Sequence, residues 1–154
     1  MTLRPFEPAD VPALLALFRD AVRRVNARDY TAEQIEAWAS DDINAAAWAE
    51  RFAGRFAFVA EGAGRPIGFV DLEDSGHIDR LYVCADHQGQ GVGRALLAAV
   101  EAEARRRRLA RLTIDASITA RPFCEAQGFT VLAQQTVTLR GAEFVNYRME
   151  RVLA

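Results

Sequence analysis

The sequence predicts a single α/β domain in which helices flank a mixed sheet of six to seven strands. Apolar runs with strand or helix periodicity follow one another in the order β-α-α-β-β-β-α-β-α-β-β. The chain has 154 residues, 51% of them hydrophobic, which suits one domain with a sizeable core. It contains no internal repeat, low-complexity stretch or linker. We therefore expect residues 1–154 to form one domain with about four helices.

The first elements are a short strand and two helices. Residues 3–6 indicate a strand, and Asp10 is expected to cap the first helix, whose apolar residues recur at helical spacing: Leu14, Leu17, Phe18, Val22 and Val25. The second helix is expected to begin at Thr31, because Thr31 and Gln34 have the spacing of a capping box.

The middle of the chain predicts an antiparallel meander. Residues 55–60 and 66–73 have strand character and are joined by 61–65, and the turn at 74–76 leads into a third strand, 77–84.

The second half begins with a helix from about Val92 to Arg108, because apolar residues four apart stack on one face. A strand, a short helix that stops at Gly128 and the two strands of a closing hairpin follow, at residues 111–116, 119–127, 129–139 and 143–152.

Composition excludes several classes of function. The net charge of −2 and the pI near 5.7 argue against a nucleic-acid partner, and the basic run 105–108 is interpreted as a solvated helix end that complements the helix dipole. Two cysteines and two histidines make neither a disulfide framework nor a metal set, so no metal is expected. No apolar run is long enough to span a membrane and the N-terminus is too polar for a signal peptide, so we expect a cytoplasmic protein.

Three glycines alternate along the loop at residues 87–93, between a strand and a helix. A helix start leaves N–H groups unpaired and carries partial positive charge, so this junction favours a phosphate or pyrophosphate. The alternative, a loop that only needs positive φ angles, explains one glycine more easily than three. A dinucleotide fingerprint would require glycine where Arg94 or Leu96 stands, and the Lys-Ser/Thr pair of a P-loop is missing.

The loop resembles a known family. Gln88, Gly91 and Gly93 fit the Q/R-x-x-G-x-G/A signature of the GNAT superfamily of N-acetyltransferases, and residues 117–129 resemble its N-x-x-A-x-x-x-Y-E-x-x-G-F segment. The resemblance covers most of residues 55–150. It implies the GNAT fold, acetyl-CoA as co-substrate, and direct acetyl transfer to a primary amine of a small molecule or of an exposed protein site.

The resemblance also implies where acetyl-CoA binds. In this family the fourth and fifth strands splay apart, which leaves strand N–H groups free to polarise the thioester carbonyl. The implied cofactor residues are Leu81, Tyr82, Val83, Gln88, Gly89, Gln90, Gly91, Val92, Gly93, Arg94 and Ser117. Ser117 stands where the family has an asparagine, and serine offers fewer hydrogen-bonding groups.

Catalytic candidates lie on the third strand of the meander. His77 and Asp79 share one face with Leu81 and Val83 by the period of two, and they align with positions where family members carry their bases. A histidine and a carboxylate could relay the proton of the amine. The alternative is a solvated strand end at His77 and an ion pair of Asp79 with Arg80 or Arg140.

Cys124 occupies the position of the family's tyrosine general acid. Either its thiol protonates the departing thiolate or it is a passive buried residue, in which case Tyr147 or Tyr82 could serve. An acetyl-cysteine intermediate is a third hypothesis. Without the tyrosine and asparagine, a catalytically degraded acyl-CoA-binding regulator is the alternative function.

Tyr30 and Trp38 are the candidates for binding the acceptor. The resemblance places the first helices and the closing hairpin around the acceptor cleft, where aromatic faces and carboxylates would suit a cationic amine. The alternative for Trp38 is a place in the core. The hairpin edge could pair with a second copy, so a monomer and a homodimer both stay open.

Overall fold

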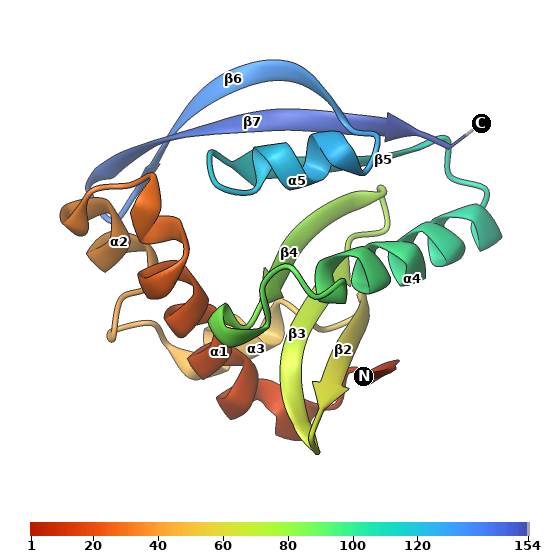
Figure 1. Ribbon diagram of the computed structural model, residues 1–154, viewed down its shortest axis with the longest axis horizontal. Coiled ribbons are helices and arrows are strands. Elements are labelled where there is room, and N and C mark those ends of the chain that lie inside the picture. The colour runs from red at the N-terminus through yellow and green to blue at the C-terminus, as the bar shows by residue number, and fades with distance from the viewer. Residues whose placement is uncertain (154) are drawn as a thin grey trace.

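The computed structural model describes residues 1–153 and contains a seven-stranded mixed sheet with helices on both faces (Figure 1). The strands lie in the order β1-β2-β3-β4-β5-β7-β6. Only β4 and β5 pair in parallel, so the predicted meander and closing hairpin are confirmed. Their bounds are Thr2–Pro5 (β1), Phe56–Gly62 (β2), Arg65–Leu72 (β3), His77–Val83 (β4), Arg111–Ser117 (β5), Thr130–Leu139 (β6) and Ala142–Val152 (β7).

Four of the helices were expected and one was not. The bounds are Val11–Arg24 (α1), Ala32–Trp38 (α2), Ala45–Glu50 (α3), Val92–Arg106 (α4) and Arg121–Ala126 (α5). The unexpected α3 is a short alanine-rich helix that Asn44 caps by accepting the Ala47 N–H at 2.9 Å. The capping box that starts α2 is confirmed, since Thr31 and Gln34 each accept the backbone N–H of the other.

Asp10 does not cap α1 as expected. Its side chain accepts no hydrogen bond from the first turn of α1. It accepts the Glu7 N–H at 2.8 Å and pairs with the Arg4 guanidinium at 2.6 Å. These two contacts of Asp10 therefore stabilise the segment that connects β1 to α1.

Each face of the sheet packs against its own hydrophobic core. On one face the predicted apolar stripe of α4 is buried together with β3, β4 and β5 residues such as Leu72, Ile78 and Leu112. On the other face α1, α2 and α3 bury an aromatic cluster that includes Phe18, Trp48, Phe69 and Phe144.

A β-bulge interrupts β4 at Asp79. Leu72 of β3 faces Ile78 but the preceding Asp71 faces Arg80, so β4 carries one extra residue. The expectation that one face of β4 holds His77, Asp79, Leu81 and Val83 is therefore wrong. Leu81 and Val83 pack into the α4-side core, whereas Asp79 contacts the arginines that follow α3 on the opposite face.

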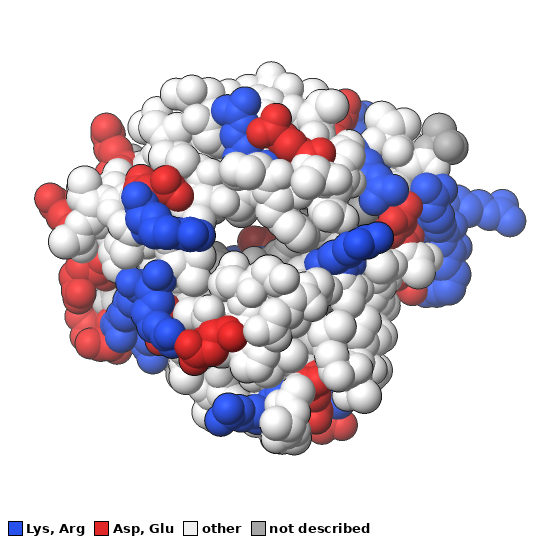
Figure 2. Space-filling model, viewed as in Figure 1, with Lys and Arg blue, Asp and Glu red and all other residues white. Residues whose placement is uncertain are grey.

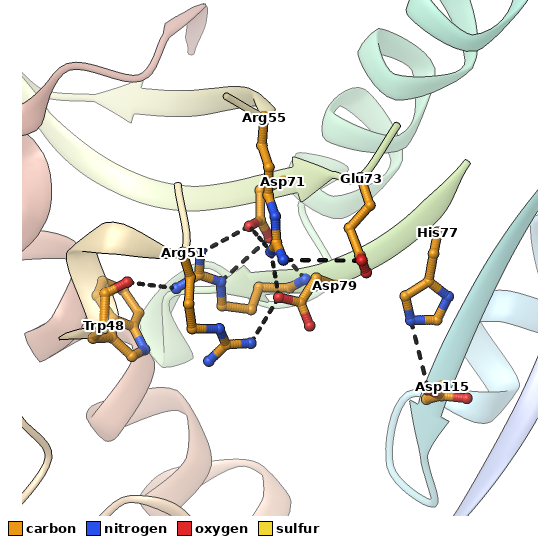
Figure 3. A network of polar contacts seen from close by, with 9 residues as sticks. Trp48, Arg51, Arg55, Asp71, Glu73, His77, Asp79 and Asp115 are labelled. Atoms are coloured by element: carbon orange, nitrogen blue, oxygen red, sulfur yellow. Dashed lines mark hydrogen bonds and ion pairs between the residues drawn. The ribbon is translucent and has the colours of Figure 1, made fainter. Parts of the chain in front are cut away.

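A buried ion pair between Asp71, which Figure 3 labels, and Arg80 holds this bulge in place. Asp71 is completely buried and Arg80 is 3% exposed. The Asp71 carboxylate accepts the backbone N–H of Arg80 at 2.9 Å and its guanidinium at 2.8 Å. The guanidinium also lies over the Phe52 and Trp48 rings, 4.0 and 4.7 Å from their centroids. The N–H group that a bulge leaves without a ladder partner is thus satisfied by a side chain.

The parallel pairing of β4 and β5 stops just before the bulge. Only His77 with Thr113 and Ile78 with Ile114 are in register. Because a bulge bends its strand and increases its twist, the rest of β4 diverges from β5. The sheet consequently opens in its middle, as the resemblance implied.

Three of the four arginines in the basic run 105–108 pair with acidic side chains. Arg105 pairs with Glu101 at 3.0 Å, and Arg106 and Arg107 pair with Glu103 at 2.7 and 2.6 Å. Hydrogen bonds from Arg106 and Arg107 hold the pKa of Glu103 at about 2. No helix within residues 1–153 has both the length and the apolar character of a membrane span.

We expect Asp71→Ala to lower the free energy of unfolding by about 3–5 kcal/mol, because it leaves the buried Arg80 charge unpaired. The matched control is Asp74→Ala, which removes a pair with Arg107 at 3.3 Å from a side chain that is 89% exposed. That control should cost about 1 kcal/mol or less. Urea unfolding followed by circular dichroism measures both, and equal losses would contradict the structural role of Asp71.

Candidate functional site

The gap between β4 and β5 leads into a cavity of about 420 Å³. Figure 2 shows an opening near the middle of the face that it draws, and Figure 1, drawn from the same side, places α4 and α5 on either side of this opening. The cavity is lined by the end of β4, the glycine loop with the start of α4, the end of β5, and α5. Of the implied cofactor residues, all except Gln90 line it.

Each glycine of the loop has its own local requirement. Gly89 and Gly91 have φ angles of +71° and +84°, which side chains rarely adopt. Gly93 lies in α4, where a Cβ atom would come within 3.1 Å of the Phe123 ring. Positive φ angles thus account for two of the three glycines but, as expected, not for all of them, and the close contact with Phe123 concerns Gly93. The space beyond Gly89 and Gly91 is nevertheless open, next to the free N–H groups of the first turn of α4.

Gln88 connects this loop to β4. Its side-chain amide donates to the Val83 carbonyl at 2.9 Å. Gln90 instead donates to the Asp86 carbonyl at 3.4 Å and stays outside the cavity lining.

Two backbone N–H groups of β4 point into the gap. The N–H of Cys84 donates to Ile67 of β3 at 2.8 Å, and the N–H of Arg80 points to Asp71 on the same side. Because N–H groups alternate along a strand, those of Leu81 and Val83 point the other way, toward the diverging β5. Such donors can stabilise an oxyanion.

His77 contacts β5 and is separated from Asp79. Its Nδ1 lies 2.8 Å from Thr113 Oγ1. Its Nε2 lies 3.5 Å from Asp115 Oδ2 (Figure 3). The sequence analysis did not name Asp115 as a site residue. Its position near the end of a strand that was expected to border the gap could have indicated it. It lines the cavity from the β5 side.

Asp79 is held between Arg55 and Arg51, and the Asp79–Arg51 distance is 2.7 Å. Burial acts to raise the pKa of Asp79, but these two guanidiniums outweigh it and the pKa lies below its usual value. Asp79 pairs with neither Arg80 nor Arg140, the two partners that the sequence suggested. Arg80 pairs with Asp71, and Arg140 donates to the Ala37 carbonyl.

Cys124 lines the cavity but is fully buried, and burial raises the pKa of its thiol to about 12. Ser117 Oγ accepts the Ala120 N–H at 3.0 Å and the Asn26 amide at 3.3 Å. The side-chain amide of Asn26, which follows α1, thus contacts Ser117 of β5, and the sequence analysis did not predict this contact.

A second cavity of about 190 Å³ meets the first across the gap. Both cavities are lined by Trp38, Tyr82, Asp115 and Ser117. Tyr30 lines the second, but its hydroxyl is occupied: it donates to the Val145 carbonyl at 2.8 Å and accepts the Ile118 N–H at 2.9 Å. Trp38 packs edge to face with Tyr30 and Phe144 and lines both cavities, so it contributes to both pocket and core.

Comparisons with known proteins agree with this geometry. The family model of the acetyltransferase (GNAT) domain matches residues 26–151. The Escherichia coli K12 protein YafP, described as an uncharacterized N-acetyltransferase, is 37% identical over 148 residues, which cover 96% of this chain and 93% of YafP.

Solved structures agree as well. A GCN5-related N-acetyltransferase from Rhodopseudomonas palustris superposes with a TM-score of 0.95 at 37% identity, covering 99% of this chain and 95% of that one. Salmonella typhimurium YncA, determined with its cofactor acetyl-CoA, has a TM-score of 0.68 at 25% identity and covers 100% of this chain and 94% of its own.

We expect Cys124 to resist alkylation in the folded protein. A thiol pKa of about 12 leaves about 10⁻⁴ of Cys124 as thiolate at pH 8, and the thiolate is the reactive form. Iodoacetamide labelling followed by peptide mass spectrometry should leave Cys124 mostly unmodified, and should modify it readily in 8 M urea. Folded-state labelling as fast as that of an unstructured cysteine peptide would contradict its burial.

Proposed function

Because this chain belongs to the GNAT family of N-acetyltransferases, we propose that it transfers the acetyl group of acetyl-CoA directly to a primary amine of a small molecule. The observation that carries the proposal is the meeting of two cavities across the gap between β4 and β5. A thioester held in one cavity and an amine held in the other can react there without an enzyme-bound acyl intermediate.

The larger cavity fits acetyl-CoA. The loop leaves open space beside Gly89 and Gly91, and two buried polar atoms, His87 Nδ1 and Thr119 Oγ1, have no hydrogen-bond partner among residues 1–153. Both residues line this cavity. We assign the pyrophosphate to the loop from Gln88 to Arg94 and the pantetheine arm to Leu81, Tyr82, Val83 and Ser117, with Asn26 supporting Ser117. Gln90 is assigned a supporting place in the loop.

The residues of the gap would promote the reaction in two ways. The N–H groups of Leu81 and Val83 stabilise the oxyanion that forms when the amine attacks the thioester carbon. The Asp115 carboxylate, backed by His77, accepts the proton from the attacking nitrogen. Asp79 also lines the larger cavity, but two arginines pair with it and hold its pKa below its usual value, so it is a poorer base than an isolated carboxylate.

The departing thiolate needs a proton, and Cys124 is a poor source. Its raised pKa makes proton transfer to a more acidic thiol unfavourable, so we assign Cys124 a passive packing role. Tyr82 lines both cavities, but burial raises the pKa of its hydroxyl as well, so the same objection applies to it. Tyr147 packs against Arg121, whose guanidinium lies over its ring, and it lines neither cavity. We therefore propose that the thiolate departs unaided and takes its proton from solvent.

Thermal unfolding with and without acetyl-CoA tests the cofactor assignment. Acetyl-CoA at about 100 times its dissociation constant should stabilise the fold by about 2.7 kcal/mol and raise Tm by several degrees. NAD and ATP at the same concentration are the controls and should have little effect. A shift with NAD or ATP but none with acetyl-CoA would contradict the assignment.

Release of free CoA thiol in the presence of small primary amines tests turnover. His77→Gln should lower kcat at neutral pH by about tenfold or more, as expected for loss of the imidazole that backs the Asp115 proton acceptor, without changing the thermal shift with acetyl-CoA. Binding of acetyl-CoA without thiol release for any amine would support the acyl-CoA-binding regulator instead.

A further inference from the structure

The smaller cavity is apolar except at one end. Its aromatic and aliphatic walls are Tyr30, Trp38, Tyr82, Phe144, Val137 and Leu139. Its polar groups are Asp115, Ser117 and Asn146, and Asp115 is the one charged residue among those that line it. Asp115 also lines the larger cavity, so the charge lies where the two cavities meet.

One oxygen of the Asp115 carboxylate has accepting capacity left. Oδ1 accepts Arg148 Nε at 2.7 Å and Gln135 Nε2 at 3.0 Å. Oδ2 has only longer contacts, with an Arg148 nitrogen at 3.4 Å and His77 Nε2 at 3.5 Å. A carboxylate oxygen accepts two hydrogen bonds. Oδ2 can therefore take a shorter hydrogen bond from an N–H group that enters the gap.

Size and polarity limit what can enter. A volume of about 190 Å³ is below the range of about 300–1,000 Å³ typical of drug-sized ligands, and close to the roughly 150 Å³ cavity that holds benzene. A second charge on the ligand would lie against apolar walls, where burial without a partner is costly. The part of a ligand that this cavity can enclose is thus one amine on a body of about one ring.

We infer that this acceptor cavity selects hydrophobic monoamines, with the amine at Asp115 Oδ2. The inference rests on the proposed function and deepens it.

In the transfer, the neutral amine nitrogen forms a bond to the thioester carbon and the C–S bond breaks. The nitrogen gives its proton to the Asp115–His77 pair, and the departing thiolate takes one from solvent, so protons and electron pairs balance.

Steady-state kinetics with benzylamine, isoamylamine, spermidine and glycinamide tests the selection. We expect kcat/KM for benzylamine to exceed that for spermidine and for glycinamide by at least about 30-fold, the effect of about 2 kcal/mol. A preference for spermidine or glycinamide would overturn the inference and leave the proposed function standing. Absence of thiol release with every amine would overturn both.

Two variants and a control test the residues. Asp115→Asn should lower kcat/KM for benzylamine by about 10²-fold while the thermal shift with acetyl-CoA stays unchanged. Val137→Phe narrows the cavity from a strand position that is 38% exposed, so it should keep the fold. It should lower kcat/KM at least tenfold for benzylamine and less than threefold for methylamine.

Glu150→Gln is the matched control, because this carboxylate lies on β7, pairs with Arg111 at 3.1 Å and lines neither cavity. It should leave kcat/KM within twofold of the unmodified protein. Equal loss in Glu150→Gln and Asp115→Asn, or equal effects of Val137→Phe on both amines, would overturn the assignment of the cavity.

Discussion

Inside the sheet, the Asp71 carboxylate accepts both the backbone N–H and the guanidinium of Arg80, and this contact keeps an extra residue in β4. The bulge it holds comes directly after the last residue of β4 that pairs with β5. Without the bulge, regular parallel pairing would continue along both strands and close the gap. The buried pair also stacks on Phe52 and Trp48, so the aromatic core under α3 supports the same point.

The chemistry proposed for the site depends on that gap in two ways. Divergence of the strands leaves the N–H groups of Leu81 and Val83 without a ladder partner, in the place where an oxyanion would form. It also brings the Asp115 side chain to the meeting point of a cofactor-sized and a one-ring cavity. Backbone N–H donors that the sheet holds in place require no reorganisation during the reaction. Because every residue except proline has such a donor, apolar residues such as Leu81 and Val83 can provide it.

The sequence carried enough information for the order of elements, the capping box at Thr31 and the glycine loop, because these depend on residues close together in the chain. The bulge depends on Asp71 and Arg80, nine residues apart on different strands, and the alternation rule for β4 failed there. The contact made by His77 depends on the register of β4 on β5, which places Asp115 beside it. Asp79 instead lies among the arginines that follow α3. Likewise, the close contact that favours glycine at position 93 comes from Phe123, thirty positions later in the chain.

The most direct measurement of the central claim is an NMR titration of the ¹⁵N-labelled protein with acetyl-CoA, followed through its backbone amide resonances. We expect the largest shifts at the N–H groups of Leu81 and Val83 and along residues 89–94, with small shifts at Tyr82, whose N–H points toward β3. Large shifts confined to other parts of the chain, with Leu81 and Val83 unmoved at saturation, would contradict the role assigned to the gap between β4 and β5.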